Sequence, residues 1–184
     1  MGSAPPCDTD LLPMPLTLAK LNKSDRTAFT AALGHLFEHS PWVAQETWPR
    51  RPFRDAAHLQ AELNATLRAA PAERQLALIR AHPDLAGRLA QQDVLTKTSK
   101  REQASAGLDR LSAAELDAFQ KLNAAYRARF GFPFIICARL NAHAAILKAM
   151  QTRLPNPIAV EFDAALAEIE KIASLRLQDA LEKK

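Results

Sequence analysis

Apolar residues recur at intervals of three and four positions in one segment after another of this chain. This spacing places the apolar side chains of each segment on one face of an α-helix. The positions are Phe29, Leu33, Leu36 and Phe37; Leu59, Leu63 and Leu67; Leu76 and Ile79; Leu116, Phe119, Leu122, Tyr126 and Phe130; and Phe162, Leu166, Ile169, Ile172 and Leu175. The pattern predicts amphipathic helices that pack their apolar faces together.

Helix start and stop signals bound these segments. Side-chain caps and prolines mark the starts, whereas Ser-Pro and glycine mark the ends. The predicted starts are Ser24, Asp55, Pro71, Ser112 with Glu115 as a capping box, and Asn156-Pro157; the predicted ends are Ser40-Pro41, Gly107 and Gly131. Trp42, Trp48 and Phe53 fall in a proline-punctuated segment, which we predict to be a connection whose aromatic rings fill the core.

The run from Phe132 to Ala138 is the ambiguous one, because its β-branched and aromatic content also suits a strand. No second strand candidate exists to pair with it, and a lone strand leaves backbone groups unsatisfied. We therefore predict a buried helix that begins near Pro133 and continues through Ile146 to Met150. The expected fold is an all-α, single-domain bundle of about eight helices.

Length and composition agree with one helical domain. The chain has 184 residues, 48% of them hydrophobic, which suffices for a substantial core. Residues 1–15 contain four prolines and little periodicity. They are predicted to be a flexible leader, and residues 16–184 the domain. Neither a signal peptide nor an apolar run of membrane-spanning length is evident, so a cytoplasmic location is expected.

The charged residues point to a small ligand rather than a polymer. The net charge is +4, and Lys and Arg are scattered along the chain. Nucleic-acid binding is therefore disfavoured, whereas a mildly basic surface would attract a small anion. Cys7 and Cys137 are the two cysteines, one in the leader and one in an apolar run, so no disulfide framework is expected.

The stretch from Arg80 to Gly107 carries the densest set of reactive side chains. His82 stands directly before Pro83, which should end the preceding helix by Ala81 and suits the first position of a following helix. On spacing alone, a capping or surface histidine is favoured. Ser99 and Glu102 form S-x-x-E, and on pattern alone a capping box is favoured there too.

Two further features leave alternatives open. Arg176 falls on the apolar stripe of the last helix, where it is either a buried arginine that needs an anionic partner or a snorkelling one. His35 and His39 form H-x-x-x-H, but without the glutamate of the zinc-protease motif and without an evident third ligand. We interpret that pair as a helix surface rather than a metal site.

Blocks of sequence along nearly the whole chain resemble one enzyme family. They are FEHSPW (37–42), RPF (51–53), HPDLAGR (82–88), S-x-x-E-Q-x-x-A-G-L (99–108), LNxxYRxRFGFPFIICARLN (122–141) and EIEKIASLRL (168–177). In content, order and spacing they are similar to the family of 2-oxo-4-hydroxy-4-carboxy-5-ureidoimidazoline (OHCU) decarboxylases of purine breakdown. The resemblance implies an all-α, homodimeric enzyme that forms (S)-allantoin from this small substrate.

The resemblance also implies a site. His82 would be the acid/base, Glu102 its carboxylate partner, and Arg176 the group that stabilises negative charge. The implied substrate-binding residues are Pro83, Ser99, Lys100, Arg101, Gln103, Phe134, Ile135, Ile136, Cys137 and Ala138. No cofactor or metal is implied, since the conjugated ring of the substrate can accept the electrons that carbon dioxide leaves behind. A non-catalytic binding module and a hydrolase with a metal at His35 and His39 are the rival readings.

Overall fold

The computed structural model describes residues 16–86 and 96–182, and it is all-α, as predicted. No strand occurs in these two ranges. The α-helices are α1 (Leu18–Lys23), α2 (Arg26–Leu33), α3 (Trp42–Thr47), α4 (Ala56–Ala69), α5 (Ala72–Ala81), α7 (Lys97–Ser105), α8 (Ala113–Phe130), α9 (His143–Arg153) and α10 (Ile158–Glu182). Three short 3-10 turns accompany them: η1 (Gly34–Leu36), η2 (Trp48–Arg50) and η3 (Ala138–Leu140). The predicted leader, with Cys7, lies outside the described residues.

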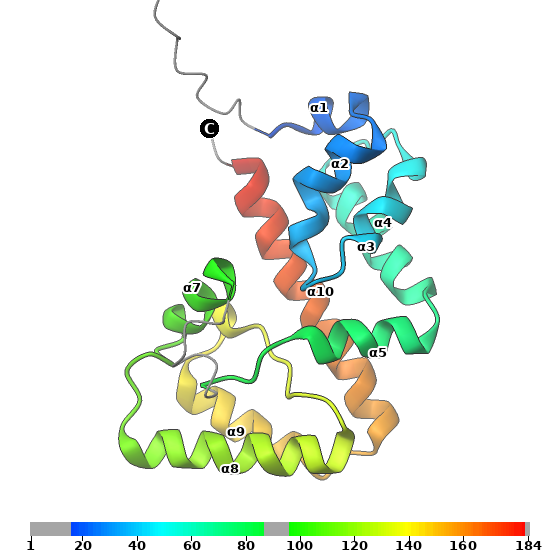
Figure 1. Ribbon diagram of the computed structural model, residues 1–184. Coiled ribbons are helices and arrows are strands. Elements are labelled where there is room, and N and C mark those ends of the chain that lie inside the picture. Colours follow the sequence, from blue (N-terminus) through cyan, green and yellow to red (C-terminus); the bar gives the residue numbers. More distant parts are fainter. Residues whose placement is uncertain (1–15, 87–95, 183–184) are drawn as a thin grey trace, which may run out of the picture.

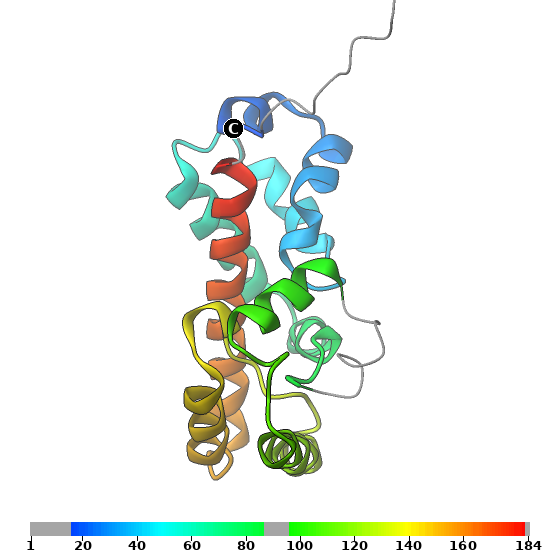
Figure 2. The same cartoon turned by 90° about the vertical axis from the view of Figure 1, so that its left-hand side faces the viewer.

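Helix α10 runs through the height of the molecule, and the other helices are arranged around it (Figures 1 and 2). Its C-terminal half lies beside α1 to α4, whereas its N-terminal half lies beside α8 and α9. The predicted apolar stripe of α10 faces inward, since Leu166, Ile169 and Ile172 are buried. Helices α5 and α7 lie at the junction of the two halves, where the predicted polar stretch is also found.

Several predicted helix ends are confirmed. Asp55 caps α4 by accepting from the His58 amide, and Ser112 and Glu115 form the capping box of α8. Gly107, with φ 77°, follows the end of α7. Its amide donates to Ala104, and the next amide donates to Gln103, which makes a Schellman motif. Gly131 ends α8 with φ 73°.

Other predicted boundaries are wrong. Asp25 rather than Ser24 caps α2, and the predicted first helix breaks at Leu33 into the 3-10 turn η1. The proline-punctuated connection contains helix α3 and turn η2. Pro41 does not prevent α3, because a proline needs no amide partner in a first turn. Its aromatic residues contribute to the core as expected, with Phe53 fully buried and the two tryptophans partly so.

The predicted helix from Pro133 to Met150 is also wrong. Residues 133–137 are extended, and helix α9 begins only at His143. The extended segment has no neighbouring strand among the described residues, but side chains bond to part of its backbone. The Glu168 carboxylate accepts from the Cys137 amide at 2.8 Å, and Arg153 donates to the Ile135 carbonyl at 2.9 Å. These helices supply the bonds that a second strand would otherwise make.

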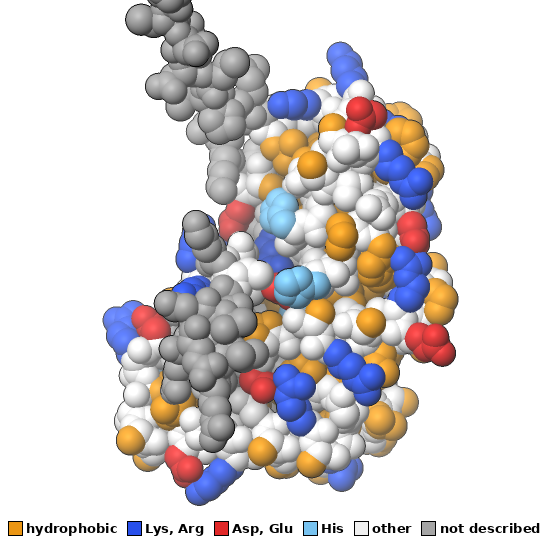
Figure 3. Space-filling model, viewed as in Figure 1, with side chains coloured by type: hydrophobic (Ala, Val, Ile, Leu, Met, Phe, Trp, Pro, Cys, Tyr) orange, Lys and Arg blue, Asp and Glu red, His pale blue; other side chains and the backbone are white. Residues whose placement is uncertain are grey.

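The surface agrees with the scattered charge of the sequence. On the face shown in Figure 3, acidic and basic side chains are distributed without a large patch of one sign. Among the described residues, no helix combines the length and apolarity needed to cross a bilayer.

Candidate active site

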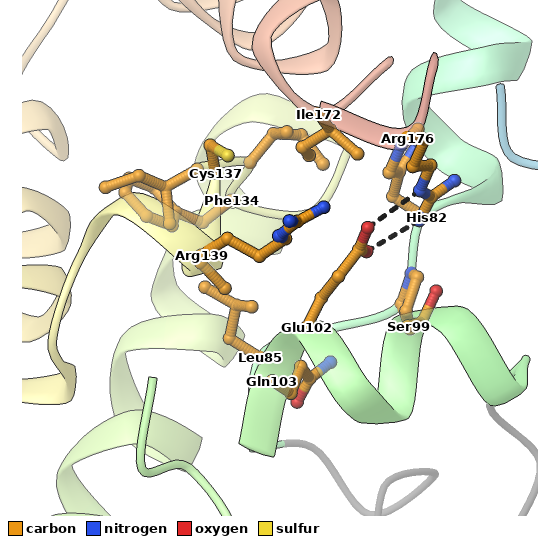
Figure 4. A pocket seen from close by; sticks show the side chains of 14 residues that line it. His82, Leu85, Ser99, Glu102, Gln103, Phe134, Cys137, Arg139, Ile172 and Arg176 are labelled. Atoms are coloured by element: carbon orange, nitrogen blue, oxygen red, sulfur yellow. Dashed lines mark hydrogen bonds and ion pairs between the residues drawn. The ribbon is translucent and has the colours of Figure 1, made fainter. Parts of the chain in front are cut away.

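A cavity lies where the end of α5, the helices α7 and α10, and the extended segment meet (Figure 4). Its empty volume, including its open mouth, is about 460 Å³. The polar lining residues are His82, Ser99, Glu102, Gln103, Arg139 and Arg176. The other lining residues are Pro83, Leu85, Phe134, Ile135, Ile136, Cys137, Ala138 and Ile172.

Arg176 is the centre of a buried charge cluster. Its Nε and Nη2 donate to the two carboxylate oxygens of Glu102, at 2.8 and 2.7 Å. Its Nη1 donates to Glu38 at 3.2 Å and to the Leu36 carbonyl at 3.3 Å. Burial alone would lower the pKa of Arg176, but the hydrogen bonds and charges of Glu102 and Glu38 outweigh it and raise the pKa. Arg176 is therefore the paired, buried arginine of the two alternatives, not a snorkelling one.

Ser99 does not cap α7, so the capping box that the pattern alone favours does not form. Thr96 is the cap, and its hydroxyl accepts from the Ser99 amide. The Ser99 hydroxyl is instead buried inside the site, 3.3 Å from the Glu38 carboxylate. Glu102, one turn further along α7, reaches Arg176 rather than a backbone amide. One face of α7 thus presents both side chains to the cavity.

His82 follows the last residue of α5, where the sequence predicts the helix to end, but it is buried rather than at the surface. Its Nδ1 lies 2.9 Å from the Leu78 carbonyl, which fixes the ring. Burial lowers the pKa of His82, while the Leu78 carbonyl and the carboxylates of Glu38 and Glu102 oppose that shift. Arg176 adds to the lowering. The ring is therefore a buried, neutral base beside two carboxylates.

The loop after His82 is held from two helices. Pro83 begins no helix within residues 83–86, contrary to the prediction, and residue 87 onward lies outside the described range. The Gln103 side chain accepts from the Ala86 amide at 3.1 Å. Arg127 of α8 pairs with both oxygens of Asp84, at 2.9 and 3.0 Å. This loop is therefore fixed without being helical.

The extended segment forms the apolar wall of the cavity. Phe134 and Ile135 are buried, and so is the unpaired thiol of Cys137. Burial, with the charges of Glu168 and Glu102, raises the pKa of that thiol, so it is protonated and unreactive at neutral pH.

The structure gathers all but two of the predicted site residues around this one cavity. Lys100 and Arg101 lie on α7 but are absent from the cavity lining; Arg101 borders two other hollows beside it. Leu85, Arg139 and Ile172 line the cavity and were not predicted. These three lie within or next to the blocks that carry the resemblance.

Glu38 is the most important residue that sequence reasoning missed. It is buried and contacts both Arg176 and Ser99. The sequence offers only a weak signal, a charged residue directly after Phe37 in FEHSPW, and a charged side chain is rarely buried without a partner.

The two histidines of H-x-x-x-H do not share a helix. His35 belongs to the turn η1, whereas His39 lies beyond it with a positive φ of 46°, and both are exposed. In the part of the chain that the structure describes, no cluster of three or more His, Cys, Asp or Glu side chains has the arrangement of a metal site.

Comparisons with known proteins agree on one family. The sequence model described as OHCU decarboxylase matches residues 22–178. The chain is 43% identical to the OHCU decarboxylase of Halalkalicoccus jeotgali over 164 residues, which are 89% of this chain and 91% of that one. It is 41% identical over 166 residues to the putative OHCU decarboxylase of Homo sapiens, covering 90% of this chain and 96% of the human one.

Solved structures share the fold. An (S)-allantoin synthase superposes with a TM-score of 0.72 and 29% identity over 91% of this chain, which spans about half (54%) of that protein. An OHCU decarboxylase crystallised with (S)-allantoin superposes with a TM-score of 0.67 over 87% of this chain and all of that one, at 24% identity. From the family match and these identities over nine-tenths of its length, the chain belongs to the OHCU decarboxylase family.

Proposed function

We propose that this protein decarboxylates OHCU to (S)-allantoin in urate breakdown, as a carbon–carbon lyase that needs no cofactor. The observation that carries the proposal is the buried group of His82, Glu102 and Arg176 around one cavity, in a chain about two-fifths identical to OHCU decarboxylases. A buried titratable ring beside a charge cluster is typical of catalytic sites.

The reaction requires proton transfers and no cofactor. The bond between the ring and the carboxylate breaks, and its electron pair moves into the ring towards the neighbouring C=N nitrogen. That nitrogen takes up one proton from water, which replaces the charge of the lost carboxylate. A second proton is then added to the carbon that carries the ureido group, and the hydroxyl loses its proton to become a carbonyl. His82, neutral in the free protein, is the proposed acid/base for these two transfers.

Glu102 and Arg176 are proposed to act as one unit. A carboxylate held by both arms of an arginine has a fixed position. Glu102 can then contact the ureido or hydroxyl groups of the substrate while Arg176 stabilises the negative charge that develops. Ser99 and Gln103 would position the ligand, with Pro83 and the backbone of residues 134–138 lining the cavity.

The test is turnover with freshly generated substrate. Urate is converted by the two upstream enzymes, and allantoin formation is followed by circular dichroism, with and without this protein. We expect a rapid signal of one sign, because a chiral site adds the proton to one face. A rate and sign no different from those without the protein would overturn the proposal and leave a non-catalytic binding module.

The domain limits and the assembly complete the proposal. We propose residues 16–184 as the catalytic domain, since the family match begins at residue 22, and a homodimer in the cytoplasm, as the resemblance implies. Light scattering coupled to gel filtration measures the mass directly. A single species near the chain mass of 20.2 kDa would contradict the homodimer.

A further inference from the structure

Most donors of Arg176 are already committed to the protein. All three guanidinium nitrogens contact acceptors, two of them on Glu102 and one shared between Glu38 and the Leu36 carbonyl. These bonds use four of the five N–H groups of the arginine. The cluster of one cation and two carboxylates also carries a net negative charge. Arg176 is therefore a poor receptor for the carboxylate of an incoming substrate, which would meet repulsion as well as occupied donors.

A second arginine faces the same cavity. Arg139 lies in η3, directly after the extended segment, and its guanidinium points across the cavity towards Glu102 (Figure 4). Among the described residues that line the cavity, Arg139 and Arg176 are the two arginines. Asp179 of α10 holds Arg139 through two bonds, at 2.8 and 3.2 Å. Its Nε and one N–H on each Nη are free of those two bonds.

Arg139 lies near the mouth of the cavity. Its side chain is 30% exposed, against 4% for Arg176. It also borders a second hollow beside the cavity, which is lined by Thr98, Arg101, Glu102, Ser105 and Asp179. Of the two arginines, Arg139 is therefore the more accessible to an anion from solvent.

We propose that Arg139 binds the carboxylate of the substrate and is a specificity-determining residue of this site. The inference rests on the proposed function. The planar fork of the guanidinium matches a carboxylate, and Asp179 keeps that fork oriented in the absence of substrate. Once carbon dioxide has left, the product carries no carboxylate, so its contact with Arg139 is lost and release is favoured. The leaving group also lies on the open side of the cavity.

The mechanism of decarboxylation predicts which kinetic constant changes when Arg139 is replaced. An ion pair with the departing carboxylate stabilises the bound substrate and does not speed bond breaking. Loss of Arg139 should therefore raise KM and leave kcat nearly unchanged. The inhibition constant of (S)-allantoin should not change, because that ligand lacks the carboxylate.

The experiment compares Arg139→Gln with the parent in the coupled assay. We expect KM to rise at least ~10-fold, kcat to stay within about threefold, and product inhibition to stay the same. Arg74→Gln is the matched control, because Arg74 also forms a partly exposed ion pair, with Glu46 at 2.8 Å, away from the cavity. It should leave KM unchanged.

Asp179→Asn separates substrate binding from a merely structural ion pair. If the pair with Asp179 were all that mattered, Asp179→Asn and Arg139→Gln would have the same effect. If Arg139 binds the carboxylate, Asp179→Asn leaves an uncompensated cation there, and KM should stay equal or fall. An unchanged KM in Arg139→Gln, or a KM that rises equally in both variants, overturns the inference. A parent protein that forms no allantoin would instead overturn the proposed function.

Discussion

Glu38 shows how one buried side chain can join several parts of a site. Its carboxylate contacts Arg176 of α10 and the Ser99 hydroxyl of α7, and it is only 5% exposed. Two carboxylates around one guanidinium leave the cluster with an extra negative charge next to His82. A buried charge without full compensation is costly, and such costs are commonly tolerated at functional sites.

Glu38→Gln should reduce the rate at least ~10-fold through the orientation of Arg176 and Ser99. It should also move the pH profile of kcat/KM. The Glu38 charge raises the pKa of His82 against the effect of burial, so its removal lowers that pKa further. The limb that reports His82 should shift to lower pH.

The control for Glu38→Gln is Glu161→Gln. Glu161 is fully buried and paired with Arg153 and Asn156, away from the cavity. This variant should melt at a lower temperature but keep the parent pH profile. Equal shifts of the pH profile in both variants would show that Glu38 acts only through general stability.

His82 is expected to affect both catalysis and the pH dependence of stability. We expect His82→Asn to fold, with kcat reduced ~10²–10⁴-fold, because the acid/base is lost. Burial lowers the pKa of His82 in the folded chain. Its contribution to stability is therefore complete above the unfolded value of about 6.5 and is lost as pH falls towards the folded value. The Tm of the parent minus that of His82→Asn should then decrease on acidification. A constant difference would contradict a buried, neutral histidine.

At the scale of elements, the two S-x-x-E motifs have different outcomes. Ser112 and Glu115 form a capping box, but Ser99 and Glu102 do not. The spacing is the same in both motifs and cannot tell them apart. In α7 the N-cap is Thr96, which leaves Ser99 and Glu102 free of a capping role. The partner of Glu102 comes from a helix 74 residues further along the chain. The resemblance, rather than the pattern, assigned Glu102 to the site.

Glu102→Gln and Glu115→Gln therefore form a matched pair. Glutamine at 102 keeps the shape but loses the charge that Arg176 needs, so we expect at least ~10²-fold loss of rate. It should also lower Tm, since the buried pair is reduced to Arg176 with Glu38 alone. Glutamine at 115 still offers an oxygen to the Ser112 amide, and both rate and Tm should stay near the parent values. Steady-state kinetics measures the rates of the two variants, and thermal melts measure their Tm values. Similar rate losses in Glu102→Gln and Glu115→Gln would show that Glu102 does not belong to the site.

The extended segment shows where sequence reasoning fails. Its apolar content correctly predicted its burial, and the resemblance implied that residues 134–138 belong to the site. The shape was wrong because its hydrogen-bond partners, Arg153 and Glu168, come from helices 18 and 31 residues away. Without a second strand candidate in the sequence, a helix is the prediction that satisfies the backbone locally. Long-range side-chain bonds to a backbone have no local signature.

At the scale of the whole molecule, α10 connects the cavity to both halves of the fold. Arg176 and Ile172 line the cavity, while Glu168 of the same helix holds the extended segment. The remaining walls come from α7, the extended segment and the residues that follow α5, so the site exists only when segments from across the chain are assembled. A ligand in this cavity contacts several of these segments at once and should stabilise the assembled chain against unfolding.

The product provides that test without turnover. At ~100 times its Kd, a ligand that binds only the folded chain adds about 2.7 kcal/mol of stability. For a chain of this length, that corresponds to a rise in Tm of roughly 5–10 °C. We expect this rise with (S)-allantoin, and an equal rise in Arg139→Gln, because the product has no carboxylate for Arg139. Ala138→Phe, which places a ring inside the cavity, should reduce the rise relative to its own ligand-free Tm. If (S)-allantoin raised the Tm of that variant as much as that of the parent, it would be binding elsewhere, and the cavity would not be the active site.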